Sequence, residues 1–320
     1  MTESFDEDTE KGPRIPLDSA LPEWLKQLPQ QSRPYATLAR WDRPVGIWLL
    51  LLPCWMGLAQ MRIPTGLQWI DIVWFLLFAI GAVAMRGAGC TWNDIRDRDI
   101  DAEVTRTASR PLPAGDVTLQ QAYMFLAGQL GIGFLVWLFL PTDAKLWALA
   151  SIPLVVAYPY MKRVTWWPQA WLGFTFNWGV LVGAATIHDG SLLNFVPLPT
   201  VLLYFGLVCW TVAYDTIYAL QDREDDALIG VKSTARLFGD KVLTGVFVFF
   251  MGATSLIFLG AYFAGAGRMG AVLALAFFAH SIWQVSSLSR NRETRALGVF
   301  KSNVWSGAIV LAGLMIAAFL

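Results

Sequence analysis

The sequence has little charge and few of the residues that most often bind transition metals. Charged residues make up 15% of its 320 positions, whereas a soluble domain carries about 25%. The formal net charge is zero, so no broad basic surface indicates a nucleic-acid partner, and we expect none. Cys54, Cys90 and Cys209 stand singly without CxxC spacing, and His188 lies far from His280. Neither a disulfide framework nor a zinc or histidine-based metal site is therefore indicated.

Long apolar runs dominate what is present. Hydrophobic residues make up 56% of the chain, and the mean hydropathy is +0.49. A membrane-spanning helix needs about 20 largely apolar residues. We predict an all-α, multi-pass membrane helical bundle whose nine transmembrane helices lie near 45–62, 67–90, 118–140, 145–160, 167–187, 199–219, 242–264, 268–286 and 299–320. The fourth carries Pro153 and Pro159, so we expect a kink there.

The positive charges between the runs are distributed on one side. The N-terminal region and the loops after spans 2, 4, 6 and 8 hold most of them, including Arg40, Arg43, Arg96, Arg98, Arg106, Arg110, Lys162, Arg163, Arg223, Lys232, Arg236, Arg290, Arg292 and Arg295. The loops after spans 1, 3, 5 and 7 hold only Arg62, Lys145 and Arg268. The positive-inside rule then predicts a cytoplasmic N-terminus and a C-terminus on the opposite side.

The N-terminal region divides from the rest by composition. Residues 1–35 begin with the acidic stretch "MTESFDEDTE", which is unlike a secretory leader and is typical of a disordered tail. In "LPEWLKQL", Leu21, Trp24, Leu25 and Leu28 share one helical stripe. This stripe predicts either a short interfacial helix or a simple packing contact. Residues 36–320 form the predicted membrane domain.

Two acidic stretches interrupt this apolar chain, and both lie on the predicted cytoplasmic side. In "NDIRDRDID", Asn93, Asp97 and Asp101 are spaced four apart, so they share one face if span 2 continues as a helix, with Asp94 beside them. We call Asn93, Asp94, Asp97 and Asp101 the first acidic stripe.

The second acidic stretch lies at the end of span 6. In "YDTIYALQDREDD", Asp222 and Asp226 follow Asp215 by seven and eleven residues. These spacings place the three aspartates on one face of a helix, with Tyr218 close to that face. We call these three aspartates the second acidic stripe. A basic pair follows each stripe, Arg106 and Arg110 after the first and Lys232 and Arg236 after the second. The two spans run in the same direction, which is typical of a weak parallel repeat.

Carboxylates stacked on one helical face repel each other and are costly near lipid. A bound magnesium ion would compensate the negative charge of these carboxylates. Magnesium is typically coordinated by one or two carboxylates, by several waters and by phosphate oxygens of the substrate. A diphosphate held by magnesium between the two stripes, with Arg and Lys on its outer oxygens, accounts for the whole pattern. The alternative is a solvated, salt-bridged loop, because Arg96 and Arg98 alternate with the aspartates.

Both stretches resemble the motifs of a known family. "NDIRDRDID" is similar to the NDxxDxxxD motif of the UbiA superfamily of intramembrane prenyltransferases, and "YDTIYALQDREDDALIGVKSTA" is similar to its second aspartate motif. "RWDRPVGIWLLLLPCWMG", "RTASRPLPAG" and "YPYMKRVTWWPQAWLGFTFNWG" resemble segments of its 4-hydroxybenzoate polyprenyltransferase branch, which serves ubiquinone biosynthesis. The resemblance covers about residues 36 to 320.

The resemblance implies a nine-span bundle around a central cavity open toward the cytoplasm and the lipid, in a bacterial or mitochondrial inner membrane. It implies Mg²⁺-dependent transfer of a polyprenyl group from polyprenyl diphosphate to the carbon ortho to the hydroxyl of 4-hydroxybenzoate. By the same resemblance the metal ligands are Asn93, Asp97, Asp101, Asp222 and Asp226, with Asp94 and Asp215 supporting them. We predict that Asp97, Asp101, Asp222, Asp226 and Arg163 act in catalysis.

The chemistry of the two substrates adds further candidates. The diphosphate leaving group needs cations, for which we predict Arg106, Arg110, Lys162 and Lys232. The carboxylate of the acceptor needs a basic partner, either Arg43 or Arg163, although plain positive-inside arginines would look the same. Arg163 could equally hold the diphosphate. The ring proton goes either to a motif aspartate or to the released diphosphate.

The allylic cation formed by ionisation needs a dry, π-rich wall, because water would trap it. Trp166, Trp167, Trp171, Phe174, Phe176 and Trp178 are candidates, or else they form an interfacial aromatic belt. We predict Asn177 and Tyr218 as further substrate-binding residues.

Three other functions compete with this reading. A sibling prenyltransferase would use haem, a naphthoate, homogentisate or a chlorophyll precursor as its acceptor. A divalent-cation transporter would use the stripes as an ion path, but transporters place such sites near the bilayer midplane, whereas these stripes lie at helix ends. A structural membrane scaffold has no need of clustered carboxylates.

Overall fold

The computed structural model describes residues 22–103, 107–187, 196–221, 223 and 230–320, and these contain helices and no strand. The predicted all-α fold is confirmed: within the described residues nine helical stretches are long and apolar enough to cross a membrane. The acidic tail, Leu21, Arg106, Asp222 and Asp226 lie outside the described residues. The chain divides into two compact units, Met1–Pro44 with Ala84–Ile132 and Val45–Val83 with Gly133–Leu320.

The first unit holds the short N-terminal helices α1 (Glu23–Lys26), η1 (Gln30–Ser32) and α2 (Arg33–Leu38). It also holds the second half of α4 (Trp69–Glu103) and most of α5 (Leu119–Phe139). Leu38, Ile95, Leu112, Val117 and Ala122 form its apolar core.

The predicted helical stripe comprised Leu21, Trp24, Leu25 and Leu28. Within the described part of this segment the α-helix covers only Glu23–Lys26, which includes Trp24 and Leu25. Leu25 is fully buried, while Trp24 is half-exposed. The choice between an interfacial helix and a packing contact stays a prediction. The boundary of the membrane domain at residue 36 stays a prediction.

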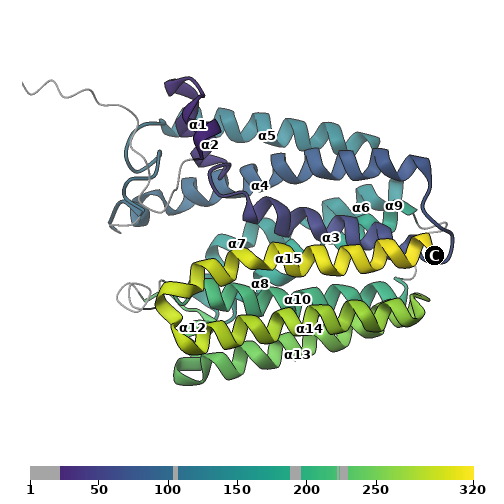
Figure 1. Cartoon of the computed structure of the whole chain (residues 1–320). Coiled ribbons are helices and arrows are strands. Elements are labelled where there is room, and N and C mark those ends of the chain that lie inside the picture. The colour runs from purple at the N-terminus through teal and green to yellow at the C-terminus, as the bar shows by residue number, and fades with distance from the viewer. Residues whose placement is uncertain (1–21, 104–106, 188–195, 222, 224–229) are drawn as a thin grey trace, which may run out of the picture. The chain divides into compact units, whose positions relative to one another are not determined.

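The second unit is a bundle of long helices. Its members are α3 (Val45–Arg62), the first half of α4, α6 (Thr142–Ala150), α7 (Ile152–Val164), α8 (Pro168–Phe176), α9 (Gly179–Ile187), α10 (Leu198–Tyr218), α12 (Thr234–Phe238), η2 (Gly239–Lys241), α13 (Val242–Phe263), α14 (Gly267–Arg290) and α15 (Arg292–Phe319). Neighbouring helices pack in the order α10, α13, α14, α15 and α3 (Figure 1).

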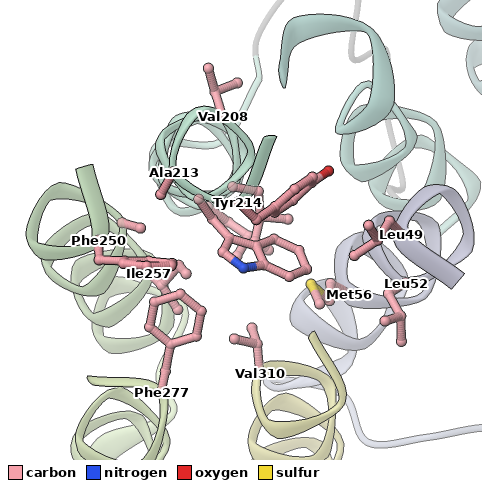
Figure 2. Close-up of a cluster of buried hydrophobic side chains, with 14 of the residues drawn as sticks. Leu49, Leu52, Met56, Val208, Ala213, Tyr214, Phe250, Ile257, Phe277 and Val310 are labelled. Atoms are coloured by element: carbon pink, nitrogen blue, oxygen red, sulfur yellow. The ribbon is translucent and has the colours of Figure 1, made fainter. Parts of the chain in front are cut away.

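The core of this bundle is built from large apolar side chains. Figure 2 shows how Leu49, Met56, Tyr214, Phe250, Ile257, Phe277 and Val310 converge from α3, α10, α13, α14 and α15. Trp210 is fully buried among them, and its indole N–H donates to Asn303 Oδ1 at 2.8 Å. In lipid each buried polar group needs such a partner.

Small residues let α3 and α9 approach closely. A Cβ placed at Gly183 would lie 2.1 Å from the carbonyl oxygen of Cys54, and one at Gly57 would lie 2.1 Å from that of Val180. Only glycine fits a contact this close, as is typical of helix pairs packed inside membranes.

Two predicted spans are broken. The fourth, Thr142–Val164, divides into α6 and α7 at Ser151, because Pro153 has no N–H to donate to the preceding turn. The expected kink is thus present. The fifth divides into α8 and α9 at Asn177, whose side-chain amide donates to the carbonyl of Gly173 at 2.8 Å and satisfies that helix end.

Candidate functional site

The first acidic stripe lies on one uninterrupted helix. Helix α4 continues through Glu103, past the end of the apolar run. Asn93, Asp97 and Asp101 therefore share one face, as the spacing predicts. Asp97 is 3% exposed and Asp101 8%, and Asp94 has no exposed surface. Carboxylates buried this deeply require hydrogen-bonded cations.

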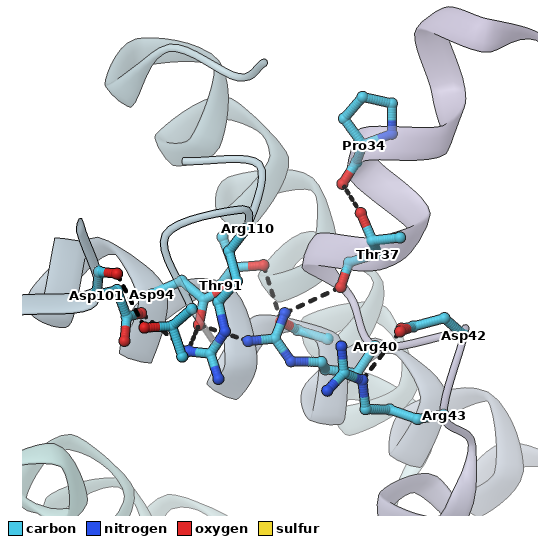
Figure 3. A network of polar contacts seen from close by, with 11 residues as sticks. Pro34, Thr37, Arg40, Asp42, Arg43, Thr91, Asp94, Asp101 and Arg110 are labelled. Atoms are coloured by element: carbon cyan, nitrogen blue, oxygen red, sulfur yellow. Dashed lines mark hydrogen bonds and ion pairs between the residues drawn. The ribbon is translucent and has the colours of Figure 1, made fainter. Parts of the chain in front are cut away.

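Two arginines supply part of this compensation within the first unit. Arg40 Nη2 donates to Asp94 Oδ1 at 2.7 Å. Arg110 Nη1 donates to Asp101 Oδ2 at 2.9 Å and lies 3.6 Å from Asp94 Oδ1 (Figure 3). The predicted diphosphate-binding residue Arg110 thus lies directly against two residues of the stripe. Its role toward substrate stays a prediction.

Arg40 is held in its charged form by these surroundings. Burial alone lowers the pKa of its guanidinium, but attraction to the carboxylate of Asp94, to Cys90 and to Asp42 outweighs burial and raises that pKa. The guanidinium of Arg40 is consequently a permanent buried cation beside the acidic stripe.

Arg43, a predicted acceptor-binding residue, lies in the same segment. Its Nε donates to Asp42 Oδ2 at 2.9 Å, and the Asp42 side chain has no exposed surface (Figure 3). Asp42 Oδ1 is buried with no hydrogen-bond partner. Arg43 is therefore already paired with the carboxylate of Asp42, and its pairing with the carboxylate of the acceptor stays a prediction.

The donor set of the first stripe fits magnesium. Three carboxylates and one amide supply only oxygen ligands, which Mg²⁺ prefers. Asp94 Oδ2 is buried and has no hydrogen-bond partner. Among the described residues no three Asp, Glu, His or Cys side chains form a closed metal cluster.

The second acidic stripe begins at the end of α10, in the second unit. Asp215 and Tyr218 lie in the last turn of this helix and are both half-buried. The ring of Tyr218 packs on Phe300 with a centroid distance of 4.7 Å. Asp222 and Asp226, like Arg106 of the first unit, fall outside the described residues, so their roles stay predictions.

Two basic candidates far apart in the sequence meet in the second unit, Lys162 in the last turn of α7 and Lys232 before α12. The backbone N–H of Lys232 donates to the carbonyl of Lys162 at 2.9 Å, and Lys232 Nζ donates to the carbonyl of Val164 at 3.2 Å. Arg163 follows Lys162 at the exposed end of α7. The structure thus gathers Lys162, Arg163 and Lys232, which we call the basic segment contact. These contacts join backbone groups and one lysine side chain, so the role of the three cations toward a diphosphate stays a prediction.

The segment that carries Lys232 is fixed by two buried hydrogen bonds. The N–H of Thr234 donates to Gln169 Oε1 of α8 at 3.0 Å. The hydroxyls of Thr234 and Thr216 lie 2.5 Å apart, which joins the start of α12 to the end of α10. The end of α10 that carries Asp215 is thereby held to the segment that carries Lys232.

Asn177 is fully buried, and its side-chain NH₂ group is hydrogen-bonded within the bundle. Its Nδ2 lies within hydrogen-bond distance of Gly173 O, Leu207 O and Thr211 Oγ1, at 2.8, 3.1 and 2.7 Å. Its Oδ1 has no hydrogen-bond partner. The amide therefore ties α8 to α10 in this structure, and contact with substrate stays a prediction.

The aromatic candidates around α8 divide into two groups. Phe174 and Trp178 pack around Tyr204, with ring centroids 6.4 and 6.1 Å away. Trp166 and Trp167 are about two-fifths exposed, as suits an interfacial belt. Trp171, Phe174, Phe176 and Trp178 are half-buried, and their role as a dry, π-rich wall stays a prediction.

The sequence patterns missed Arg40, Asp42 and Gln169. Arg40 and Asp42 belong to "RWDRPVG", where only Arg43 was singled out, and the alternation of charges in that segment was the available signal. Gln169 acts through a tertiary hydrogen bond, for which a single sequence carries no signal.

Comparison with known proteins supports the resemblance drawn from the motifs. The model of the UbiA prenyltransferase family matches residues 49–318. The mitochondrial 4-hydroxybenzoate polyprenyltransferase of Bos taurus is 42% identical over 315 residues, covering 96% of this chain and 81% of that protein. These matches confirm the predicted resemblance.

Solved structures show the same fold. The apo structure of a UbiA homologue from Aeropyrum pernix K1 has a TM-score of 0.70 at 26% identity, covering 84% of this chain and 97% of that one. A UbiA homologue from Archaeoglobus fulgidus, bound to GPP and Mg²⁺, has a TM-score of 0.61 at 16% identity, covering 87% and 99%. The second likeness concerns the fold alone.

Proposed function

Because this chain belongs to the UbiA prenyltransferase family, we propose that it transfers a polyprenyl group from polyprenyl diphosphate to the carbon ortho to the hydroxyl of 4-hydroxybenzoate. The observation that carries the proposal is the stripe of buried carboxylates at the end of a membrane-spanning helix. It occurs in a chain 42% identical, over 96% of its length, to a 4-hydroxybenzoate polyprenyltransferase.

The chain is an integral membrane protein, and ubiquinone biosynthesis is the process that its product serves. The arginine and lysine distribution between spans supports an N-terminus and an active site on the cytoplasmic side. A polyprenyl substrate is itself a membrane lipid, so a site at the ends of spanning helices receives the chain from the bilayer and the phenolic acid from water.

Magnesium would be held by Asn93, Asp97 and Asp101 of the first stripe and by Asp222 and Asp226 of the second, with Asp94 and Asp215 beside them. Bound magnesium would neutralise the charge that develops on the departing diphosphate, the electrostatic contribution that usually dominates. The proposal that both stripes act on one diphosphate rests on their paired sequence pattern.

The chain's own residues have three tasks in this reaction. Lys162 and Lys232 of the basic segment contact, with Arg110, attract the outer diphosphate oxygens. Arg43 or Arg163 orients the acceptor by its carboxylate, so that the ring carbon beside the hydroxyl faces the allylic carbon. Aromatic side chains such as Phe174 and Trp178 keep water from the allylic cation.

The test combines product identification with two matched substitutions. Membranes containing the protein are incubated with ring-labelled 4-hydroxybenzoate and a series of polyprenyl diphosphates, and the product is identified by mass. Asp97→Asn and Asp222→Asn should each abolish most turnover, since the amide keeps the size but loses the charge. The double variant should be scarcely worse than either single one, because groups acting as a unit are strongly non-additive.

Two results would contradict the proposal. Full activity after chelation of divalent metal would exclude the metal–diphosphate mechanism. Product formed only with a naphthoate, homogentisate or haem acceptor would reassign the chain to a sibling prenyltransferase.

A further inference from the structure

Helix α2 ends in a way that ordinarily requires glycine. The N–H of Trp41 donates to the carbonyl of Ala36 at 2.9 Å, and the N–H of Arg40 donates to that of Thr37 at 3.0 Å. This pair of bonds is a Schellman ending, in which the residue at the position of Arg40 adopts the left-handed conformation. Arg40 has a φ of 60°, the one positive φ outside glycine among the described residues.

A side chain at this position is unfavourable for the backbone. The left-handed conformation brings Cβ close to the following carbonyl oxygen, and glycine avoids this contact. Strained residues persist where the surrounding contacts hold them, and such residues concentrate at functional sites. The arginine at position 40 therefore needs a reason that lies in its side chain.

The side chain of Arg40 connects the end of α2 to α4. Its Nη1 donates to the carbonyl of Thr37 at 3.0 Å and its Nη2 to Asp94 Oδ1 at 2.7 Å (Figure 3). The side chains of Arg40 and Asp94 are 10% and 1% exposed. The guanidinium thus makes a charge-assisted bond in a buried setting, where such bonds are strong and geometrically specific.

The contact continues from Asp94 toward a predicted metal ligand. Arg110 Nη1 lies 3.6 Å from Asp94 Oδ1 and 2.9 Å from Asp101 Oδ2. Thr107, in the same segment as Arg110, donates from its hydroxyl to the backbone carbonyl of Asp101 at 2.9 Å. Charges of alternating sign therefore run from α2 through Asp94 and Arg110 to the last turn of α4.

We propose that Arg40 is a positioning residue for the first acidic stripe, and that Asp94 is its anchor on α4 instead of a direct metal ligand. This inference rests on the proposed metal-dependent function. Asp94 Oδ1 faces the guanidinium groups of Arg40 and Arg110, and Arg110 also pairs with Asp101 Oδ2. Asn93, Asp97 and Asp101 share the helical face beside Asp94. Partners that orient metal ligands typically change metal affinity by about ten- to hundredfold when they are removed.

The direction of the effect separates this role from two others. If Arg40 only ends α2, glycine serves better, and Arg40→Gly leaves metal affinity unchanged. If Asp94 is itself a ligand, the guanidinium competes with the metal, and Arg40→Gly tightens binding. A positioning role predicts that Arg40→Gly binds the metal more weakly, because the variant loses the hydrogen bond that joins the end of α2 to α4.

The chain offers a matched control for the loss of a buried ion pair. Arg62 Nη2 lies 2.8 Å from Asp71 Oδ1, and these side chains are 10% and 2% exposed, almost as Arg40 and Asp94 are. Arg62 is the last residue of α3 and Asp71 lies in the first turn of α4, at the end of that helix opposite to the first acidic stripe. Arg40→Lys and Arg62→Lys thus each remove a buried guanidinium while keeping the charge.

The experiment measures Mn²⁺ binding to full-length protein in detergent, by the loss of the electron paramagnetic resonance signal of free Mn²⁺. An unreactive thio-analogue of a prenyl diphosphate is present throughout. Wild type and Arg62→Lys should share one dissociation constant. Arg40→Gly should raise it about ten- to hundredfold, and Arg40→Lys by a smaller factor. The magnesium concentration for half-maximal turnover should shift likewise, with an unchanged KM for 4-hydroxybenzoate.

Three results overturn the inference. Mn²⁺ binding by Arg40→Gly that is equal to or tighter than that of wild type excludes a positioning role. Equal weakening in Arg62→Lys would assign the effect to general loss of stability. A wild type that binds no Mn²⁺ overturns the proposed function and this inference with it. Where Arg40→Gly yields no folded protein, the comparison of Arg40→Lys with Arg62→Lys decides.

Discussion

The hydrogen bond from Thr234 to Gln169 offers a direct perturbation of the basic segment contact without altering a charged residue. Thr234 is the first residue of α12, and the first N–H groups of a helix have no partner within it. Gln169 Oε1 supplies that partner at 3.0 Å. We expect Gln169→Leu to release the segment that carries Lys232, while Gln169→Glu keeps an acceptor oxygen in place.

The magnitude follows from burial. Thr234 has no exposed surface and Gln169 is 4% exposed, so water cannot replace the lost acceptor. An orphaned buried N–H costs about 1–3 kcal/mol, and each 1.4 kcal/mol is roughly a factor of ten in an equilibrium constant. If the segment relaxes to recover that free energy, Lys232 leaves Lys162, and the KM for polyprenyl diphosphate should rise by about five- to hundredfold.

Two measurements check this chain of reasoning. Hydrogen–deuterium exchange should rise in peptides covering residues 230–238 of Gln169→Leu and stay near wild type in Gln169→Glu. Kinetics with labelled 4-hydroxybenzoate should show the higher KM for the diphosphate alone, with the KM for the acceptor unchanged. Faster exchange with an unaltered KM would refute the assignment of Lys232 to the diphosphate. Unaltered exchange would refute the structural argument itself.

Three further outcomes are expected. If Arg43 or Arg163 pairs with the benzoate carboxylate, its replacement by Ala should raise the KM for the acceptor more than the KM for the donor. The lost charge-assisted contact corresponds to about 1.5–3 kcal/mol of binding free energy. A rise confined to the KM for the donor would reassign that arginine to the diphosphate. Gly183→Ala should lower the melting temperature in detergent through about 1–3 kcal/mol of overpacking against Cys54, whereas Gly89→Ala, with open space around it, should not. A reporter fused after Leu320 should lie on the side of the membrane opposite to one placed in the loop after Arg163, and agreement between the two would refute the span count.

The fold was predictable because its strongest signal is local. Runs of about 20 apolar residues identify spanning helices one at a time, and the structure retains all nine within its described residues. Helix ends were less readable. The apolar run stops near residue 90, but helix α4 continues through the charged stretch to Glu103. Hydropathy marks the end of the apolar run and does not mark the end of the helix. Pro153 correctly indicated the break in the fourth span.

The site was only partly predictable, and the limit is physical. Periodicity placed Asn93, Asp97 and Asp101 on one face, since the geometry of a single helix decides this. It could not show that Arg40, more than fifty residues earlier, is the cation against Asp94, because an ion pair between elements depends on tertiary packing. Nor does sequence reveal a left-handed φ at an arginine, where turn rules would favour glycine.

The polar groups of this chain lie where burying them in a membrane costs the least free energy. Between the ends of a span every backbone group is bonded within its helix, and a charge there is costly. At helix ends the unpaired N–H and C=O groups need partners in any case, so side chains such as Gln169 and Thr107 satisfy backbone and fix a loop in one contact. The first acidic stripe and Asp215 of the second occupy such ends. Glycine at position 40 would relieve about 1–2 kcal/mol of backbone strain, yet it would leave the buried carboxylate of Asp94 short of a cation, and breaking a buried pair in this way costs about 3–5 kcal/mol. The larger effect decides the residue: the end of α2 keeps an arginine in a glycine conformation because the charge on α4 requires it.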